Sequence, residues 1–186
     1  YADGSDAIHI VPNSRNQPAE FTETRFPILV EKLGLWADSG GAGTYRGGLG
    51  YEKEYRMLVD CSTIVTADRV RLGCYGVNGG KAGQPFGAYV DAEGRDEKLG
   101  GLVDNEPIKA GEILRVRTTG GGGWGDPLDR DTAAVLHDVI QGKVSRDGAK
   151  NDYGVVFAEG ADGPQIDDAA TDSLRAELRA ARTEPL

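Results

Sequence analysis

Histidine and cysteine are scarce in this chain, which has only His9, His137, Cys61 and Cys74 among its 186 residues. Two histidines far apart in the sequence do not form a metal cluster, and without a Gly-x-Ser-x-Gly elbow no catalytic triad is plausible. The two cysteines are too widely spaced for a zinc knuckle or a redox pair, so we expect buried free thiols. We place His137 on the exposed face of a helix. The residues alone therefore disclose no complete active site.

An excess of basic residues is also lacking, since 21 lysines and arginines face 30 acidic residues, and so are long apolar runs. The formal net charge is −9, which excludes nucleic-acid binding by counterion release and disfavours an anionic membrane surface. No run of about 18 apolar residues could cross a membrane, and no signal-peptide pattern is present. We therefore expect a cytoplasmic protein with no nucleic-acid or membrane partner. Because the chain begins at Tyr1, we interpret it as a fragment, a processed chain or a trimmed piece of something longer.

Glycine, by contrast, is abundant, with 28 residues, while apolar residues make up 39 % of the chain. This composition predicts a loop-rich, mostly β body with a limited core, which completes the burial of its apolar residues against a partner surface. The glycines gather in DSGGAGTYRGGLG (38–50), CYGVNGGKAGQP (74–85) and GGGGWGDP (120–127). The first two lack the P-loop pattern, so they are either backbone nests for an anion or, as we favour, turns between strands. The third is a tight turn or a place where the backbone approaches something closely.

Strand patterns dominate the first two thirds of the chain. Proline at position 18 suits the start of one helical turn. A turn is expected at 105–111, and a hairpin over 86–100 should turn near Glu93-Gly94. The expected strands cover residues 6–11, 28–30, 51–60, 62–72 and 112–119.

Helical periodicity follows residue 126. A first helix begins at the N-cap Asp131 and ends before Gly142, and a shorter one over 145–154 is closed by glycine. A small strand at 155–157 precedes a helix over 167–182, which has acidic residues near its start and basic residues near its end, as the helix dipole favours. The predicted fold class is therefore β-rich α+β. An antiparallel β body with glycine-rich loops covers residues 1–126, and a small helical tail covers 127–186.

Four polar side chains near the start of the chain are candidates for substrate binding. They are His9, Asn13, Arg15 and Asn16, all within a short stretch before Pro18. Arg15 can grip a carboxylate, and the two amides can orient a carbonyl group. The alternative is that the two asparagines only cap and turn the chain.

The glycine segments occur in an order that resembles a known family. DSGGAGTYRGGLG, YGVNGGKAGQPFG, GEILRVRTTGGGGWGDPLDRD and GKVSRDGAKNDYGVV follow the lead-in NSRNQPAEFTETRFPILVEKLGL. Together they resemble the C-terminal part of the hydantoinase B/oxoprolinase family, the N-methylhydantoinase B type of subunit. The resemblance covers nearly all of residues 6–157, and it rests on the joint order of motifs that are each weak.

This resemblance implies an ATP-dependent hydrolase of cyclic amides such as hydantoins, lactams or 5-oxoproline. It implies a hetero-oligomer of a hydantoinase A-like subunit, which binds ATP and Mg, the remaining N-terminal part of the hydantoinase B-like subunit, and a small-molecule substrate. A divalent metal, zinc or manganese, would lie in that upstream part, with none bound by this chain. Close relatives carboxylate acetone or acetophenone, so a ketone carboxylase is the alternative. A non-catalytic assembly or binding module is the second alternative.

The resemblance also bears on GGGGWGDP. In an assembly, the backbone at Gly121 and Gly122 could pass close to another subunit or a substrate tunnel, while Trp124 anchors its end in a pocket. Lys81, in the second glycine segment, is a further loop or interface candidate. A plain strand-to-helix turn remains equally possible.

Overall fold

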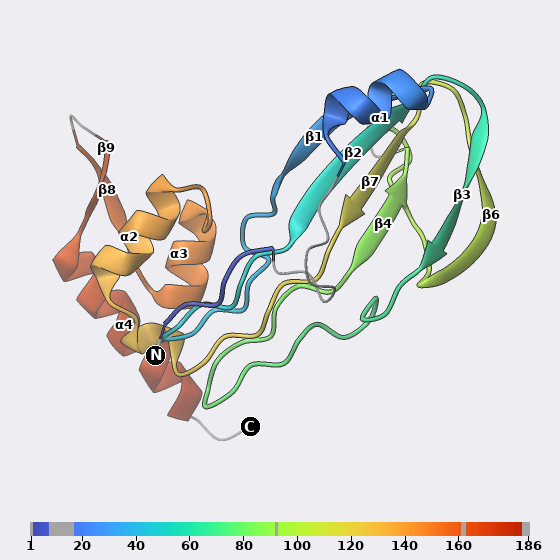
Figure 1. Cartoon of the computed structure of the whole chain (residues 1–186). Coiled ribbons are helices and arrows are strands. Elements are labelled where there is room, and N and C mark those ends of the chain that lie inside the picture. Colours follow the sequence, from blue (N-terminus) through green and yellow to red (C-terminus); the bar gives the residue numbers. More distant parts are fainter. Residues whose placement is uncertain (1, 8–16, 92, 161–162, 184–186) are drawn as a thin grey trace.

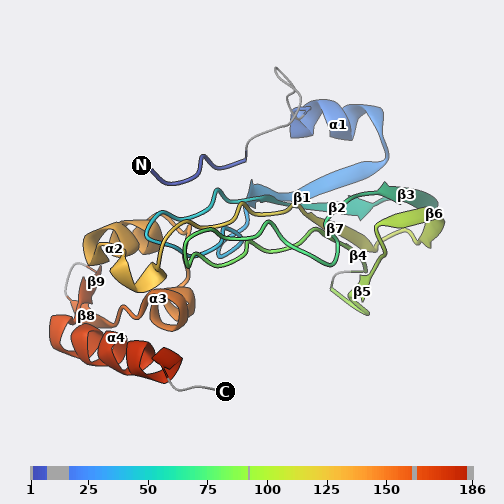
Figure 2. The same ribbon diagram turned by 90° about the horizontal axis from the view of Figure 1, so that it is seen from below.

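A computed structural model of the chain describes residues 2–7, 17–91, 93–160 and 163–183. An antiparallel sheet lies at one end and a group of helices at the other (Figure 1). Between them runs a bundle of extended segments that are neither helix nor sheet, seen side by side in Figure 2. The α+β class and the C-terminal helical part predicted from the sequence are both confirmed.

The main sheet has five strands in the order β1-β2-β7-β4-β5. One face is apolar: Tyr55 pairs with Val30 and Leu114 across the sheet, and Met57 is buried beside them. The strands are β1 (Ile28–Leu35), β2 (Tyr51–Met57), β7 (Ile113–Arg117), β4 (Gly87–Val90) and β5 (Glu97–Lys98). The expected hairpin is the pair β4–β5.

Two further elements cover the apolar face. Helix α1 (Ala19–Arg25) begins after Pro18, as expected, and stands over β1 and β2 (Figure 2). The ribbon of β3 (Cys61–Thr66) and β6 (Leu102–Ile108) packs Val65 and Ile108 into the core shared with Met57. Burial of these side chains is the main favourable contribution of this end of the molecule.

The opposite face of the sheet is charged. Glu52 and Arg117 pair across β2 and β7, as do Glu54 and Arg115, and Arg115 Nε lies 2.7 Å from Glu54 Oε1. The Arg117 guanidinium stands over the Trp36 ring, 5.1 Å from its centroid. Strand alternation thus separates an apolar from a charged face.

The middle of the molecule is a glycine bundle, which we define as residues 3–7, 38–50, 73–84 and 119–125. Its segments are tied together by backbone hydrogen bonds outside any strand. Gly41 N–H donates to Gly121 O at 2.8 Å, and Gly123 N–H donates to Lys81 O at 3.0 Å. Similar bonds tie the N-terminal residues 4 and 7 to Arg46 O and Leu49 O.

The glycines of the bundle face their neighbours with a period of three residues. A Cβ on Gly120 or on Gly123 would collide with backbone of residues 39–42, whereas one on Gly122 would collide with Tyr75 O. Gly80 and Gly83 likewise both face residues 120–124. Three residues per turn is the period of a polyproline II backbone. The glycine segments are therefore closely packed rods, and the interpretation of them as simple turns is wrong.

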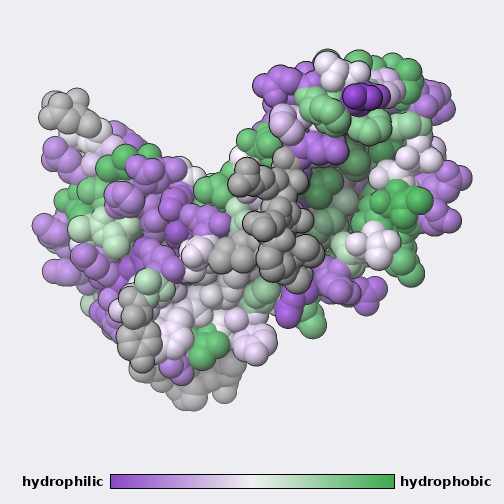
Figure 3. Space-filling model, in the orientation of Figure 1, coloured by the Kyte–Doolittle hydropathy of each residue, from purple (hydrophilic) through white to green (hydrophobic). Residues whose placement is uncertain are grey.

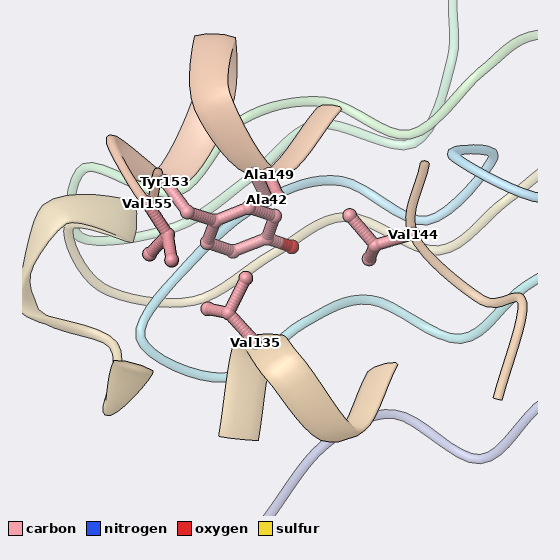
Figure 4. Packing of buried hydrophobic residues seen from close by; sticks show 6 residues of the cluster. All are labelled: Ala42, Val135, Val144, Ala149, Tyr153 and Val155. Carbon is pink, nitrogen blue, oxygen red and sulfur yellow. The ribbon is translucent and has the colours of Figure 1, made fainter. Parts of the chain in front are cut away.

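The helical part begins at η1 (Pro127–Asp129) and contains α2 (Thr132–Ile140), α3 (Arg146–Tyr153) and α4 (Asp168–Thr183), with a hairpin of β8 (Phe157–Gly160) and β9 (Gly163–Ile166). Asp131 caps α2 by accepting from Ala133 N–H, as expected. Gly154 ends α3 at a φ of 63°. Figure 4 shows the Tyr153 ring packed among Val135, Val144 and Val155, with Ala42 of the bundle in the same cluster.

Several local predictions are wrong. The turn expected at 105–111 is confined to residues 110–111, because residues 105–108 belong to strand β6; Pro107 is tolerated because this strand lies at a sheet edge. Residues 67–72 are not strand, and β8 starts at Phe157. Cys61 is exposed and Cys74 is half-buried, so the expectation that both thiols are buried is wrong. The strand expected at 6–11 falls mostly on residues outside the described part.

Candidate functional site

Buried charges meet where the glycine bundle joins the helices. Arg46, Arg130 and Asp138 are each at most 3 % exposed. Asp138 Oδ2 lies 2.8 Å from Arg130 Nη2 and 3.4 Å from Arg46 Nε. Burying such groups is tolerated only because they pair with one another. With their partners they form the ion cluster, defined as Arg46, Arg130, Lys143, Asp3, Asp6 and Asp138.

The ion cluster links three parts of the fold. Asp138 lies on α2 one turn after the buried Val135, so its carboxylate faces inward. Arg130 directly precedes the N-cap of α2 and grips Asp3 with both terminal nitrogens, at 2.6 and 2.8 Å. Arg46 comes from the bundle and reaches Asp6 at 3.1 Å. Two segments of the bundle, residues 3–7 and 38–50, and the helices are therefore held by one set of charges.

The pKa values follow from this arrangement. Burial alone would raise the pKa of the Asp3 carboxyl, but hydrogen bonds from Arg130 and from Arg46 N–H outweigh it and lower the pKa. The pKa of Asp6 is lowered for the same reason, by Leu49 N–H, Lys143 and Arg46 against the effect of burial. Burial would lower the pKa of Arg130, yet Asp3 and Asp138 raise it. Asp3, Asp6 and Arg130 are thus charged at neutral pH.

We expect the cluster to make stability depend on pH in the acid range. A carboxyl whose pKa is lower in the folded than in the unfolded chain, here below the ordinary 3.8, leaves more protons bound to the unfolded chain. The contribution is therefore complete above about pH 4–5 and is lost as pH falls through the folded pKa. Melting temperatures measured from pH 7 to pH 2.5 should show this loss. Asp3→Asn should flatten the curve, and an unchanged slope in that variant would contradict the assignment.

The candidate residues of the glycine segments lie within the bundle. Gly121 accepts the hydrogen bond of Gly41 N–H, and a Cβ on Gly122 would meet Tyr75 O. Trp124 is 37 % exposed and pairs with Tyr45, with 5.7 Å between ring centroids. Lys81 Nζ lies 2.6 Å from Asp152 on α3. The close approach signalled by GGGGWGDP is therefore to other segments of this chain.

The proposal that the glycine segments form anion-binding nests finds no support in this geometry. A nest needs several free N–H groups that converge on one ligand. Here the N–H groups of Gly41, Gly47 and Gly83 donate to Gly121 O, Gly41 O and Cys74 O. These donors are already occupied by the packing of the bundle.

The other predicted site residues are placed differently. His9, Asn13, Arg15 and Asn16 lie outside the described residues, so their role in substrate binding stays a prediction. His137 is exposed on α2, as expected. Within the described ranges, no three side chains of His, Cys, Asp or Glu gather as a metal-binding group. In the same part of the chain, no helix is long and apolar enough to cross a membrane.

Sequence reasoning missed the ion cluster. One signal was available: an acidic residue, Asp138, stands between Leu136 and Val139 and shares the inner face of its helix with Val135. A charged residue on an apolar helix face needs a buried partner. The identity of that partner was not readable, because Arg46 and Asp138 are 92 residues apart in the sequence.

Comparison with known proteins identifies the family of this fold. The model of the hydantoinase B/oxoprolinase family matches residues 1–127. Caprolactamase subunit beta of Pseudomonas jessenii is 39 % identical over 165 residues, which cover 84 % of this chain and 27 % of that subunit. The acetone carboxylase alpha subunit of Xanthobacter autotrophicus is 31 % identical over 199 residues, covering 86 % and 25 %.

Solved structures agree. The nucleotide-free structure of acetone carboxylase superposes with a TM-score of 0.78 at 25 % identity, over 99 % of this chain and 30 % of that one. The ATP-dependent caprolactamase of Pseudomonas jessenii gives a TM-score of 0.73 at 30 % identity, over 94 % and 32 %. The chain belongs to the hydantoinase B/oxoprolinase family, which confirms the resemblance seen in the ordered glycine motifs. It spans about a third or less of the length of these relatives.

Proposed function

We propose that this chain is part of an ATP-dependent hydrolase of cyclic amides. The observation that carries the proposal is its 39 % identity to caprolactamase subunit beta over 165 residues. The alignment with the acetone carboxylase subunit is less identical, and its 199 positions exceed the 186 residues of this chain, so it requires insertions. Insertions between relatives fall mostly in surface loops, where binding specificity also resides.

An ATP-dependent ketone carboxylase is the second candidate. It is favoured by the superposition on acetone carboxylase, which covers 99 % of this chain. Overall shape, however, is a weaker guide to the reaction than the residues of the site. A non-catalytic assembly or binding module is the third candidate. It is favoured because the described residues contain no group of side chains that could hold a metal ion.

Under this proposal the chain is a structural part of a larger assembly. Its partners would be a hydantoinase A-like subunit and the remaining part of a hydantoinase B-like subunit. ATP and Mg would be bound on the partner, and a divalent metal, zinc or manganese, in the remaining part. The described residues do not fit a metal, so we derive no catalytic step from them. The glycine bundle would fix the distance and orientation between the sheet and the helices.

We expect the isolated chain to show no turnover and the complete complex to hydrolyse a cyclic amide in the presence of ATP. The reason is that His137, the histidine within the described residues, is exposed on a helix and is not paired with a nucleophile. The test is to identify the subunits of the native complex by intact mass and to assay caprolactam, hydantoin and 5-oxoproline, each with ATP.

Parallel assays with acetone and bicarbonate separate the candidates. Carboxylation of acetone without amide hydrolysis would favour the second candidate. A native complex without an ATP-binding subunit would favour the third candidate, a non-catalytic module. Turnover by the isolated 186 residues would contradict the prediction of an inactive chain.

A further inference from the structure

A hollow lies between α1 and the apolar face of the sheet. Its volume is about 370 Å³, at the lower end of the range for small-molecule sites. Thr22 of α1 and Phe26, the residue that follows this helix, form one side, and Val30, Tyr55 and Leu114 form the floor. We call this cavity the α1 hollow. Figure 3 shows hydrophobic residues gathered on this face between α1 and the β3–β6 ribbon.

Among the described residues, the lining of the α1 hollow carries no charged side chain. This sets it apart from two other hollows of the described chain. One of these is lined by Arg69 and Arg71, and the other by Asp129, Arg130 and Asp131. Transfer of an ion into an uncharged, apolar cavity is costly without a partner charge. The α1 hollow therefore suits an uncharged molecule with a mainly apolar body.

Two polar side chains in the lining, the half-buried Tyr55 and the exposed Gln17, have no hydrogen-bond partner among the described residues. The Thr22 hydroxyl donates to Pro18 O at 3.1 Å. The Tyr55 hydroxyl makes no hydrogen bond to any residue in the described part of the chain, and the residue is half-buried. Burial raises the pKa of this phenol, so it keeps its proton and remains a donor at neutral pH. A half-buried tyrosine ordinarily finds a partner for its O–H group.

We propose that the α1 hollow binds an uncharged small molecule with an apolar body and one oxygen acceptor, which receives the Tyr55 O–H. The acceptor is a ketone, ester or amide oxygen. Apolar contact with Val30, Leu114 and Phe26 supplies most of the affinity, and the phenol fixes the orientation. The proposal does not rest on the proposed function, because binding is measured on this chain alone.

A matched pair of fluorinated probes tests the proposal by ¹⁹F NMR on the purified chain. In the first, 4-fluoroacetophenone, an acetyl group offers the acceptor; in the second, 4-fluorocumene, an isopropyl group of similar size replaces it. We expect saturable binding of the ketone in the millimolar range, as small ligands allow. The hydrocarbon should bind about fivefold more weakly, the value of one neutral hydrogen bond. Tyr55→Phe should abolish that difference while leaving the hydrocarbon unaffected.

Two tryptophan variants on α1 locate the binding. Ala19→Trp fills the hollow from its lining and should abolish binding of both probes. Phe21 lies on the same helix, is 45 % exposed and does not line the hollow, so Phe21→Trp should bind as the unchanged chain does. Circular dichroism confirms that each variant is folded.

Three outcomes would overturn the proposal. They are the absence of saturable binding at roughly millimolar probe, equal affinity for the two probes in the unchanged chain, and binding that survives Ala19→Trp. The last would place the probes elsewhere on the surface.

Discussion

Replacing Gly123 by alanine should destabilise the chain by about 3 kcal/mol or more, whereas Gly121→Ala should cost less than about 1 kcal/mol. Both glycines belong to the same run of four. A Cβ on Gly123 would fall far inside 3.0 Å of Ala42 O and Gly41 O, which are backbone atoms that cannot turn aside. A Cβ on Gly121 has its nearest contact at 3.1 Å, from Gly48 N. A small shift of the neighbouring segment relieves that contact.

Urea unfolding followed by circular dichroism measures the difference. Gly34→Ala in β1 is the control, because nothing lies within 4 Å of its Cβ position; it should be neutral or slightly stabilising. If Gly123→Ala fails to fold while Gly121→Ala folds, the prediction is upheld. Equal losses for the two variants would mean that chain flexibility, and not close packing, explains the run of glycines.

Asp138→Asn should destabilise the chain by about 3–5 kcal/mol, the usual effect of breaking a buried charge pair. The carboxylate lies between Arg130 and Arg46, both almost fully buried. Without the Asp138 carboxylate, the two buried guanidinium groups would lose the negative charge that they share and would repel each other. Thermal and urea unfolding of the chain at pH 7 measure the loss.

Two comparisons sharpen this test. Arg95→Gln removes the pairs of an exposed arginine with Glu97 and Glu112, and we expect a much smaller change because solvent screens such pairs. Combining Asp138→Asn with Arg130→Met should cost less than the sum of the single variants, since each change removes a charge that the other leaves unpaired. Strict additivity, or a loss as small as that of Arg95→Gln, would show that the cluster does not act as a unit.

Local features of the fold could be predicted because they depend on neighbouring residues. The N-caps Asp131 and Ser145 each accept a hydrogen bond from an N–H group two or three residues ahead. Gly154 ends its helix because its left-handed φ of 63° suits glycine. The β4–β5 hairpin follows from its turn sequence. Where a local signal was ambiguous, as at Pro107, the pairing of β6 with β3 overrode it.

The sequence by itself determined the family and the class of fold. Ordered glycine motifs identified a hydantoinase B-like chain, and helix caps and strand patterns identified an α+β protein with helices at its end. Tertiary structure alone decided what the glycines do. Whether Gly120, Gly122 or Gly123 faces a neighbour depends on segments as distant as Ser39 and Tyr75. No local propensity encodes that packing.

The same holds for the ion cluster and the α1 hollow. Asp3 and Arg130 meet although they are 127 residues apart in the sequence. Tyr55 lies under Thr22 because a sheet and a helix pack together. Such groups are brought together by long-range burial, which removes water from them and makes each pairing obligatory. Residue types and spacing specify which side chains are available, but only the assembled core determines which of them are enclosed together.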